Sequence, residues 1–165
     1  MGIFSRVSVR EFSKKPVDGA LVTELLKAAM QAPSARNQQP WEFLVITDKA
    51  RLEALSTVAP NFRSLKTAPM AIALYYHKEG LTSPTYVLQD MAACTENILL
   101  QADDMGLGAV WMGVAPNEER MALIEERFMP IEGCAPFCLI AVGHPAEKKP
   151  QQDRFDQSRI RYLTK

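Results

Sequence analysis

The sequence predicts an α/β or α+β sandwich built around one central sheet. Short runs rich in β-branched and aromatic residues alternate along the chain with stretches of helical spacing, the pattern of helices packed on a sheet. The 165 residues suffice to bury a core, and 47% hydrophobic and 23% charged residues are ordinary for a globular protein. There is no internal repeat, so we expect one domain over residues 1–165.

The first helix and the strand after it have clear signals. Asp18 is a candidate N-cap, and apolar residues follow at helical spacing up to Ala29. The helix should end near Ala32, because Pro33 disfavours helical backbone in the residue before it. After a polar loop, Trp41–Thr47 is rich in β-branched and aromatic residues and is predicted to be a strand.

The middle of the chain continues with a helix, a strand and the longest helix. Asp48 can cap a helix that runs to Val58. Pro69–Tyr76 is largely apolar, as suits a central strand. Apolar residues recur at helical spacing over Thr85–Met105, and Gly106 should end that helix, since glycine is favoured just past helix C-termini.

Two strands, a helix and an arm complete the chain. Ala109–Val114 and Ala135–Gly143 are apolar runs of strand type. Asn117–Phe128 is expected to be a helix, because asparagine caps helices and the acidic residues of its first turn suit the positive end. Residues 144–165 are polar without a clear period, so we expect an extended C-terminal arm that ends in a short strand at Ile160–Leu163.

Composition argues against several classes of protein. No apolar run approaches the roughly 20 residues of a membrane span, and the N-terminus lacks a signal-peptide pattern. We therefore expect a cytoplasmic protein without a membrane partner, and nothing in the sequence indicates a nucleic-acid partner.

Cys94, Cys134 and Cys138 fit no zinc or redox spacing and are expected to pack as small hydrophobes. The two histidines form no ligand pair, so no metal site is indicated.

The net charge is zero but unevenly distributed. Residues 1–16 carry four Lys or Arg against Glu11 alone, and residues 147–165 carry six against three acidic residues. Two basic ends on an acidic body could converge on one small anion, such as a phosphate. Charged, solvated termini would give the same pattern.

The N-terminal motif RVSVREF alternates polar and apolar residues. In an extended segment this alternation puts Arg6, Ser8 and Arg10 on one side. Two guanidinium groups and a hydroxyl suit a phosphate or a ring carbonyl. A solvated edge strand is the other interpretation.

The loop Ala32–Trp41 (APSARNQQPW) sets amide side chains between Pro33 and Pro40. Each Asn or Gln offers a donor and an acceptor on one rigid amide, which matches the edge of a pyrimidine-like ring. The prolines restrict the unfolded chain, so holding the loop costs less entropy. By itself the loop could equally be a surface linker.

The order of these motifs resembles the nitroreductase family of FMN-binding flavoproteins. RxSxREF is followed by a helix, APSARNQQPWEFLVITD, a long helix ending in GLGAVWMG, a strand ending in GHP and a basic tail. The resemblance covers nearly the whole chain, and the APSxxNxQPW-type segment is its most specific part. It implies a three-layer sandwich with a mostly antiparallel central sheet flanked by helices, in an intertwined homodimer.

The resemblance also implies a flavin site shared between two chains. Arg6 would hold the FMN phosphate, Ser8 would lie by the phosphate or ribityl chain, and Arg10 would reach N1 and the C2 carbonyl. A cation there stabilises the negative charge that collects on reduction. The resemblance implies three further sets of contacts. The partner's loop would supply Pro33, Ser34, Ala35 and Asn37, and the backbone after the long helix would supply Trp111, Met112 and Gly113. The arm would supply Arg154.

The chain departs from the family pattern in three places. Val7 and Gln152 stand where many members have a basic residue, so fewer charges would hold the phosphate. Asn61 could match a polar residue that contacts the ring in larger members, although its surroundings differ. The segment between Tyr76 and the long helix is short, which argues against a long substrate lid.

The activity that the resemblance implies is an NAD(P)H-dependent flavin oxidoreductase. NAD(P)H would deliver hydride to flavin N5 and be replaced by a nitroaromatic, a quinone or a similar small electron acceptor. Two alternatives stay open: a flavin-binding or flavin-sensing protein with little turnover, and a flavin-fragmenting enzyme of the kind that forms dimethylbenzimidazole.

Overall fold

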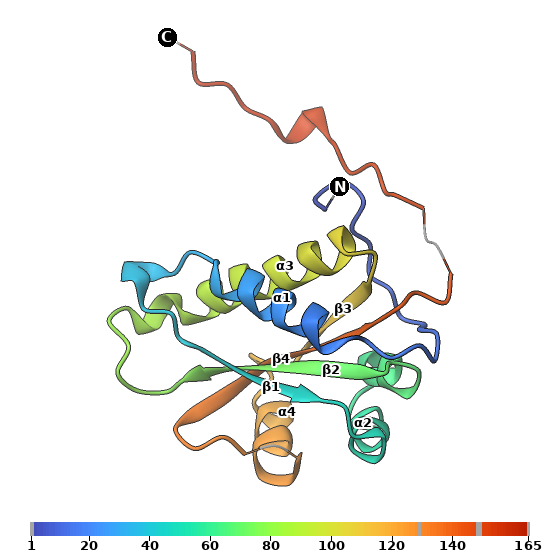
Figure 1. Ribbon diagram of the computed structural model, residues 1–165. Helices are drawn as coiled ribbons and strands as arrows, with labels where there is room; N and C mark the ends of the chain where they lie inside the picture. The colour runs from blue at the N-terminus through green and yellow to red at the C-terminus, as the bar shows by residue number, and fades with distance from the viewer. Residues whose placement is uncertain (1, 129, 148–149, 165) are drawn as a thin grey trace.

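A four-stranded antiparallel sheet forms the middle layer of the computed structural model, which describes residues 2–128, 130–147 and 150–164. In the order β1-β2-β4-β3, the strands are β1 (Trp41–Ile46), β2 (Met70–His77), β4 (Cys134–Gly143) and β3 (Gly108–Gly113). Figure 1 shows helices α1 and α3 on one face of the sheet and α2 and α4 on the other. The expected three-layer α+β sandwich is confirmed.

Three of the helices begin at the N-caps expected from the sequence. In each case the capping side chain accepts a hydrogen bond of 2.7–2.8 Å from a backbone N–H of the first turn. The pairs are Asp18 with α1 (Gly19–Met30), Asp48 with α2 (Lys49–Leu55) and Asn117 with α4 (Glu118–Leu123). The longest helix, α3 (Val87–Asp104), ends before Gly106, whose φ of +74° is the left-handed conformation that glycine tolerates.

Some boundaries differ from the expectation. The second helix stops at Leu55, and the connection after it is largely a 3₁₀ segment, η2 (Pro60–Lys66). A 3₁₀ turn, η3 (Pro84–Tyr86), precedes α3, and a π-helical segment, η4 (Ile124–Phe128), continues α4. The second helix therefore ends earlier than its apolar spacing predicts, and tighter 3₁₀ turns form the connections before β2 and before α3.

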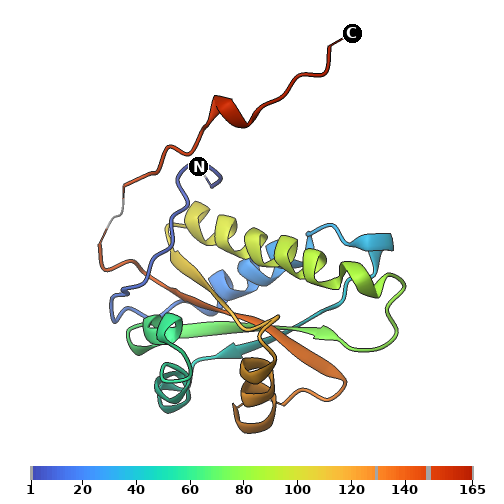
Figure 2. The ribbon, with the colours of Figure 1, turned by 180° about the vertical axis from the view of Figure 1, so that it is seen from behind.

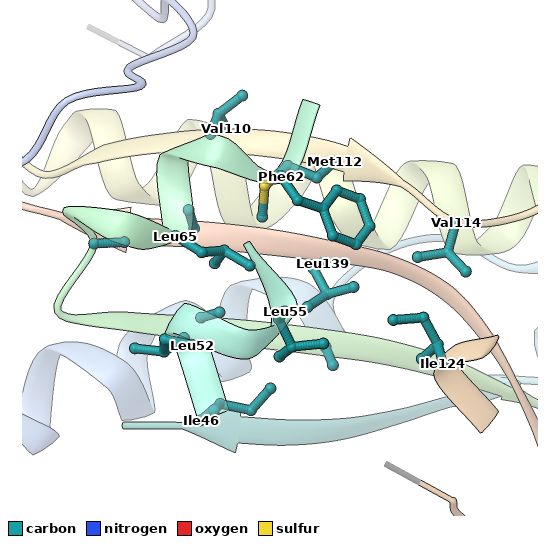
Figure 3. Close-up of a cluster of buried hydrophobic side chains, with 14 of the residues drawn as sticks. Ile46, Leu52, Leu55, Phe62, Leu65, Val110, Met112, Val114, Ile124 and Leu139 are labelled. Atoms are coloured by element: carbon teal, nitrogen blue, oxygen red, sulfur yellow. The ribbon is translucent and has the colours of Figure 1, made fainter. Parts of the chain in front are cut away.

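Two apolar cores fill the spaces on either side of the sheet. One lies between the sheet and α2, η2 and α4, where Phe62 and Leu65 of η2 pack near Val110 and Met112 of β3 (Figure 3). The other joins α1 and α3 to the opposite face and includes the fully buried Ile98. Because Phe62 and Leu65 bury one side of η2, its residues Asn61, Arg63 and Lys66 stay exposed at the surface.

The N-terminal segment lies against the outer edge of β3 (Figure 2). Ser8 forms a parallel bridge with Ala109, and the Val9 N–H donates to the Ala109 carbonyl at 3.0 Å. Val9 is buried beside Gly108, where an added Cβ would meet the Val9 side chain at 2.7 Å. This close approach fixes the backbone from which Arg6 and Arg10 project.

The C-terminal arm leaves the body on the side of the N-terminus (Figure 1). Its first residues pair with the N-terminal segment through a bridge between Pro145 and Phe12, and residues 150–164 contain one 3₁₀ turn, η5 (Gln157–Arg159), and no strand. The strand expected at Ile160–Leu163 is therefore wrong for the single chain, since an extended segment needs a neighbouring strand to satisfy its backbone. In the described parts of the chain, no helix combines the length and apolar character needed to cross a membrane.

Candidate functional site

A cationic cavity lies between the N-terminal segment and η2. Its volume is about 430 Å³. Its lining residues are Arg10, Glu11, Pro60, Asn61, Arg63, Ser64, Lys66 and Thr67. Three cationic side chains face one carboxylate there, with an amide and two hydroxyls among them, so the cavity favours an anionic ligand that also accepts hydrogen bonds.

Two cationic residues of this cavity, Arg63 and Lys66, were not expected from the sequence. They lie on the exposed side of η2, opposite the buried Phe62 and Leu65. Charged residues in a short polar connection look like ordinary solvated side chains. Only the packing of η2 against the sheet brings them beside Arg10.

Arg6 lies in a second, smaller cavity of about 230 Å³, beside α3. Its Nε pairs with Glu96 Oε1 at 3.3 Å, and its side chain is only 18% exposed. Ser5, next to it, donates a hydrogen bond to Asp103 of the same helix. Arg6 and Arg10 therefore do not share a cavity in the single chain, because acidic groups of α3 hold the first turn of the N-terminal segment.

The free edge of β3 offers backbone groups near Trp111 and Gly113. Ala109 directs its carbonyl to Val9, and the alternation of antiparallel pairing puts the backbone groups of Trp111 and Gly113 on that same edge. The Gly113 carbonyl there accepts a hydrogen bond from Arg120 Nη1 at 2.7 Å. The Trp111 ring packs against Phe137 with centroids 5.6 Å apart. Met112, which stands between Trp111 and Gly113 in the sequence, is fully buried, and its backbone lies opposite Leu139 of β4.

The amide-bearing loop adopts an unusual backbone. A 3₁₀ turn, η1 (Ala35–Asn37), occupies its middle, and φ is positive at Arg36, Asn37 and Gln39. These three side chains are exposed, whereas Ser34 accepts a hydrogen bond from the Gln39 N–H at 3.0 Å. The loop thus presents polar groups outward from a backbone tied back on itself.

The loop and the N-terminal segment contact different parts of α3: the loop reaches its first turn, Arg6 its middle and Ser5 its last turn. Asp90, in the first turn of α3, accepts a hydrogen bond from the Ala35 N–H, while Arg6 and Ser5 reach Glu96 and Asp103 further along. From Asp90 to Asp103 the helix rises by about 20 Å. Figure 1 shows the loop at one end of α3 and the N-terminal segment toward its other end. One chain does not bring its loop to its own arginines.

Arg154 lies on the exposed arm, and the structure does not bring it to Arg6. Its Nε donates to Gln152 Oε1 at 3.1 Å, a contact two residues away in sequence. The exposed Phe155 follows it. The two basic ends therefore do not converge within this chain.

All three cysteines are free and buried, as expected from the sequence. Burial raises the pKa of the Cys94 thiol to about 12. Burial also raises the pKa of Cys138, and burial together with the charge of Glu42 raises that of Cys134. Thiols held in the protonated form are poor nucleophiles, so no thiol chemistry is assigned to them.

These features define the class of protein: an α+β sandwich with a cationic cavity between η2 and an N-terminal segment that pairs with an edge strand. The family model "Nitroreductase family" matches residues 3–61 and 57–144. A protein of Methanothermobacter thermautotrophicus, named "Putative NADH dehydrogenase/NAD(P)H nitroreductase", is 38% identical over 158 residues, covering 96% of this chain and 83% of its own. The chain belongs to the nitroreductase family.

Solved structures have the same fold. A crystal structure from Clostridium acetobutylicum, described as a "Putative NADH Oxidase", superposes with a TM-score of 0.95 at 44% identity, covering all of both chains. A "putative nitroreductase in complex with fmn" from Desulfovibrio desulfuricans has a TM-score of 0.85 at 28% identity, covering 99% of this chain and 95% of its own.

Proposed function

We propose that the protein is an FMN-dependent oxidoreductase that passes reducing equivalents from NAD(P)H to a nitroaromatic, a quinone or a similar small acceptor. The observation that carries this proposal is the cationic, amide-bearing cavity at Arg10, which lies between η2 and the N-terminal segment that pairs with β3. Family membership, the nitroreductase names of the relatives and the FMN complex of a structural neighbour support it.

The residues present fit FMN. Arg10 supplies a cation and Asn61 an amide in one cavity, a donor set that suits the carbonyls and N1 of the flavin ring. Arg6, with Ser8 two residues away, supplies the charge and hydroxyl that suit a phosphate. The backbone N–H groups of Trp111 and Gly113 offer donors at a strand edge.

Each group has a distinct part in the chemistry. Bound FMN would accept hydride from NAD(P)H and pass electrons to the acceptor. Arg10 stabilises negative charge at the pyrimidine end of the ring, which favours the reduced cofactor. Arg6 anchors the phosphate, and Glu96 orients Arg6 through Nε. No side-chain nucleophile is required, consistent with the buried, protonated thiols.

We propose that each flavin site is completed by a second copy of the chain. Along α3, the Asp90 contact of the loop is about 9 Å from Glu96, which pairs with Arg6, and about 20 Å from Asp103, which accepts from Ser5, while Arg10 lies beside η2. We therefore infer that the loop of a partner is the one that reaches the arginines. Pro33, Ser34, Ala35 and Asn37 would then border the partner's flavin. Arg154 of the arm would join a phosphate site only after the arm moves onto a partner.

Several exposed apolar groups support a homodimer. On the arm, Phe155 is 74% and Leu163 104% exposed, values that a stable surface segment avoids. Further large apolar side chains are exposed on the N-terminal segment and beside α1 and α3: Ile3, Phe4, Met30, Tyr86 and Leu88. In the described residues β1 pairs on one side only, with β2, so an extended segment of a second chain fits its other edge.

The visible spectrum of the purified protein tests the proposal. We expect a yellow protein, or a colourless one that FMN restores, whose flavin absorbance is bleached by NADH or NADPH without oxygen and returns on adding a quinone. Steady-state kinetics should give parallel double-reciprocal lines. A protein that FMN does not restore contradicts the proposal. Bound flavin that neither nucleotide reduces favours flavin binding without turnover, and release of dimethylbenzimidazole favours the fragmenting enzyme.

A further inference from the structure

Asp90 is a buried carboxylate to which the proposed flavin chemistry gives no part. It is 5% exposed and lies in the first turn of α3. Its Oδ1 accepts a hydrogen bond from the Ala35 N–H at 2.9 Å, and its Oδ2 accepts one from Gln38 Nε2 at 2.6 Å. Both donors belong to the amide-bearing loop, 55 and 52 residues away in sequence.

Gln38 extends this anchor to the connection before α3. Its Nε2 also donates to the Ser83 carbonyl at 3.1 Å, and its Oε1 accepts from the Ser83 N–H at 2.9 Å. The side-chain amide of Gln38 thus joins the loop both to Asp90 in the first turn of α3 and to Ser83 in the connection before that helix. Gln38 points inward, while its neighbours Asn37 and Gln39 are exposed.

The loop needs such an anchor because its backbone is strained. Arg36, Asn37 and Gln39 have φ values of 51°, 55° and 46°. The left-handed conformation costs a residue with a side chain about 1–2 kcal/mol, less for asparagine. Such strain persists only where the surrounding structure fixes it. The fixed contacts here are the two carboxylate bonds, the Gln38–Ser83 pair and the Ser34 hydroxyl.

We infer that Asp90 is a positioning residue of the shared flavin site: it holds the loop from Pro33 to Gln39 in the shape that meets the partner's flavin. This inference rests on the proposed function. Only a carboxylate suits the position, because both loop groups that face it are donors and an ionised carboxylate is acceptor-only. The amide of an asparagine would turn a donor toward one of them.

Asp90→Ala and Asp90→Asn test the inference through two readouts, FMN affinity and hydrogen exchange of the loop amides. We expect the Kd for FMN to rise by about tenfold or more, since only part of the loop population stays in the binding shape. The amides of Ala35 and Gln39 should lose protection, while those of β2 and β4 keep theirs. Asp104→Ala, which removes an exposed carboxylate of the same helix, should change neither readout.

A stability control separates positioning from general weakening. Ile98→Ala opens a cavity in the same helix away from the loop and should lower the melting temperature while leaving the FMN Kd unchanged. If Asp90→Ala does not fold, Gln38→Ala removes the second half of the anchor and should raise the Kd in the same direction. A wild-type FMN Kd in these Asp90 or Gln38 variants overturns the inference. Failure of the wild-type protein to bind FMN would instead contradict the proposed function.

Discussion

Under the proposed function, the loop from Pro33 to Gln39 and the C-terminal arm both contact a partner chain, yet the two segments differ in how their own chain holds them. The loop is tied to α3 by buried Asp90 and to itself by Ser34. The start of the arm, residues 144–147, is bonded to the N-terminal segment, but in residues 150–164 the hydrogen bonds join near neighbours and large apolar side chains face solvent. The loop is pre-organised by folding of its own chain, whereas we propose that the arm becomes ordered only against a partner.

Removal of the arm should have the largest effect. A chain that ends at Glu147 lacks the segment that covers the partner, so we expect a monomer, and because the neighbour's loop is then missing, FMN should no longer be retained. Sedimentation velocity with detection of flavin absorbance measures both properties. A truncated chain that stays dimeric and fully loaded with FMN would show that neither dimer formation nor FMN binding depends on the arm.

Loss of Arg6 should weaken FMN binding more than loss of Arg154. A charge-assisted hydrogen bond is worth about 1.5–3 kcal/mol, so Arg6→Ala should raise the Kd by about 100-fold. Arg154 is exposed on the arm, so we expect the Kd to rise by about tenfold for Arg154→Ala. Fluorescence titration with FMN measures both, and Arg6→Lys, which keeps the charge, should fall between Arg6→Ala and wild type. Equal losses for the two arginines would contradict the ranking.

Polar replacement of the arm's apolar side chains should weaken the dimer. Burial of a Phe or Leu side chain stabilises by about 1.5–3 kcal/mol, so Phe155→Ser or Leu163→Ser should each raise the dimer dissociation constant by about tenfold or more. Dilution followed by light scattering measures this constant. Gln151→Ser, a polar change on the same arm, serves as the control and should leave it unchanged.

Glycine at Arg36 should have the smallest effect. Glycine relieves the left-handed strain at φ of 51° in the folded chain but increases the conformational entropy of the unfolded chain. These two contributions to the free energy of unfolding nearly cancel. We expect the free energy of unfolding to change by less than about 1 kcal/mol. Denaturant titration measures it, with Ser158→Gly on the arm as the comparison. A loss of several kcal/mol would mean that the Arg36 side chain itself stabilises the loop.

Local signals in the sequence were sufficient for most of the fold. Asp18, Asp48 and Asn117 cap their helices as expected, and Gly106 ends the longest one, because these preferences depend on neighbouring residues only. The strand expected at Ile160–Leu163 was wrong for the single chain, since its pairing would require another strand beside it.

The candidate site was less predictable. Arg10 and Asn61 lie in one cavity, but Arg63 and Lys66 join them only through the packing of η2. Asp90 contacts a loop 55 residues away and carries no local sign of that role in the first turn of its helix. Contacts between distant residues depend on the tertiary structure, and no periodicity or spacing reports them.

A mixed dimer tests the shared site most directly. One subunit carries Arg6→Ala and the other Asp90→Ala, with different affinity tags so that the heterodimer is purified alone. If each loop serves the neighbour's flavin, one site has both defects and the other has none, so we expect one FMN bound per dimer with wild-type affinity. If each loop serves its own chain, both sites are defective, and the absence of any wild-type site would contradict the account.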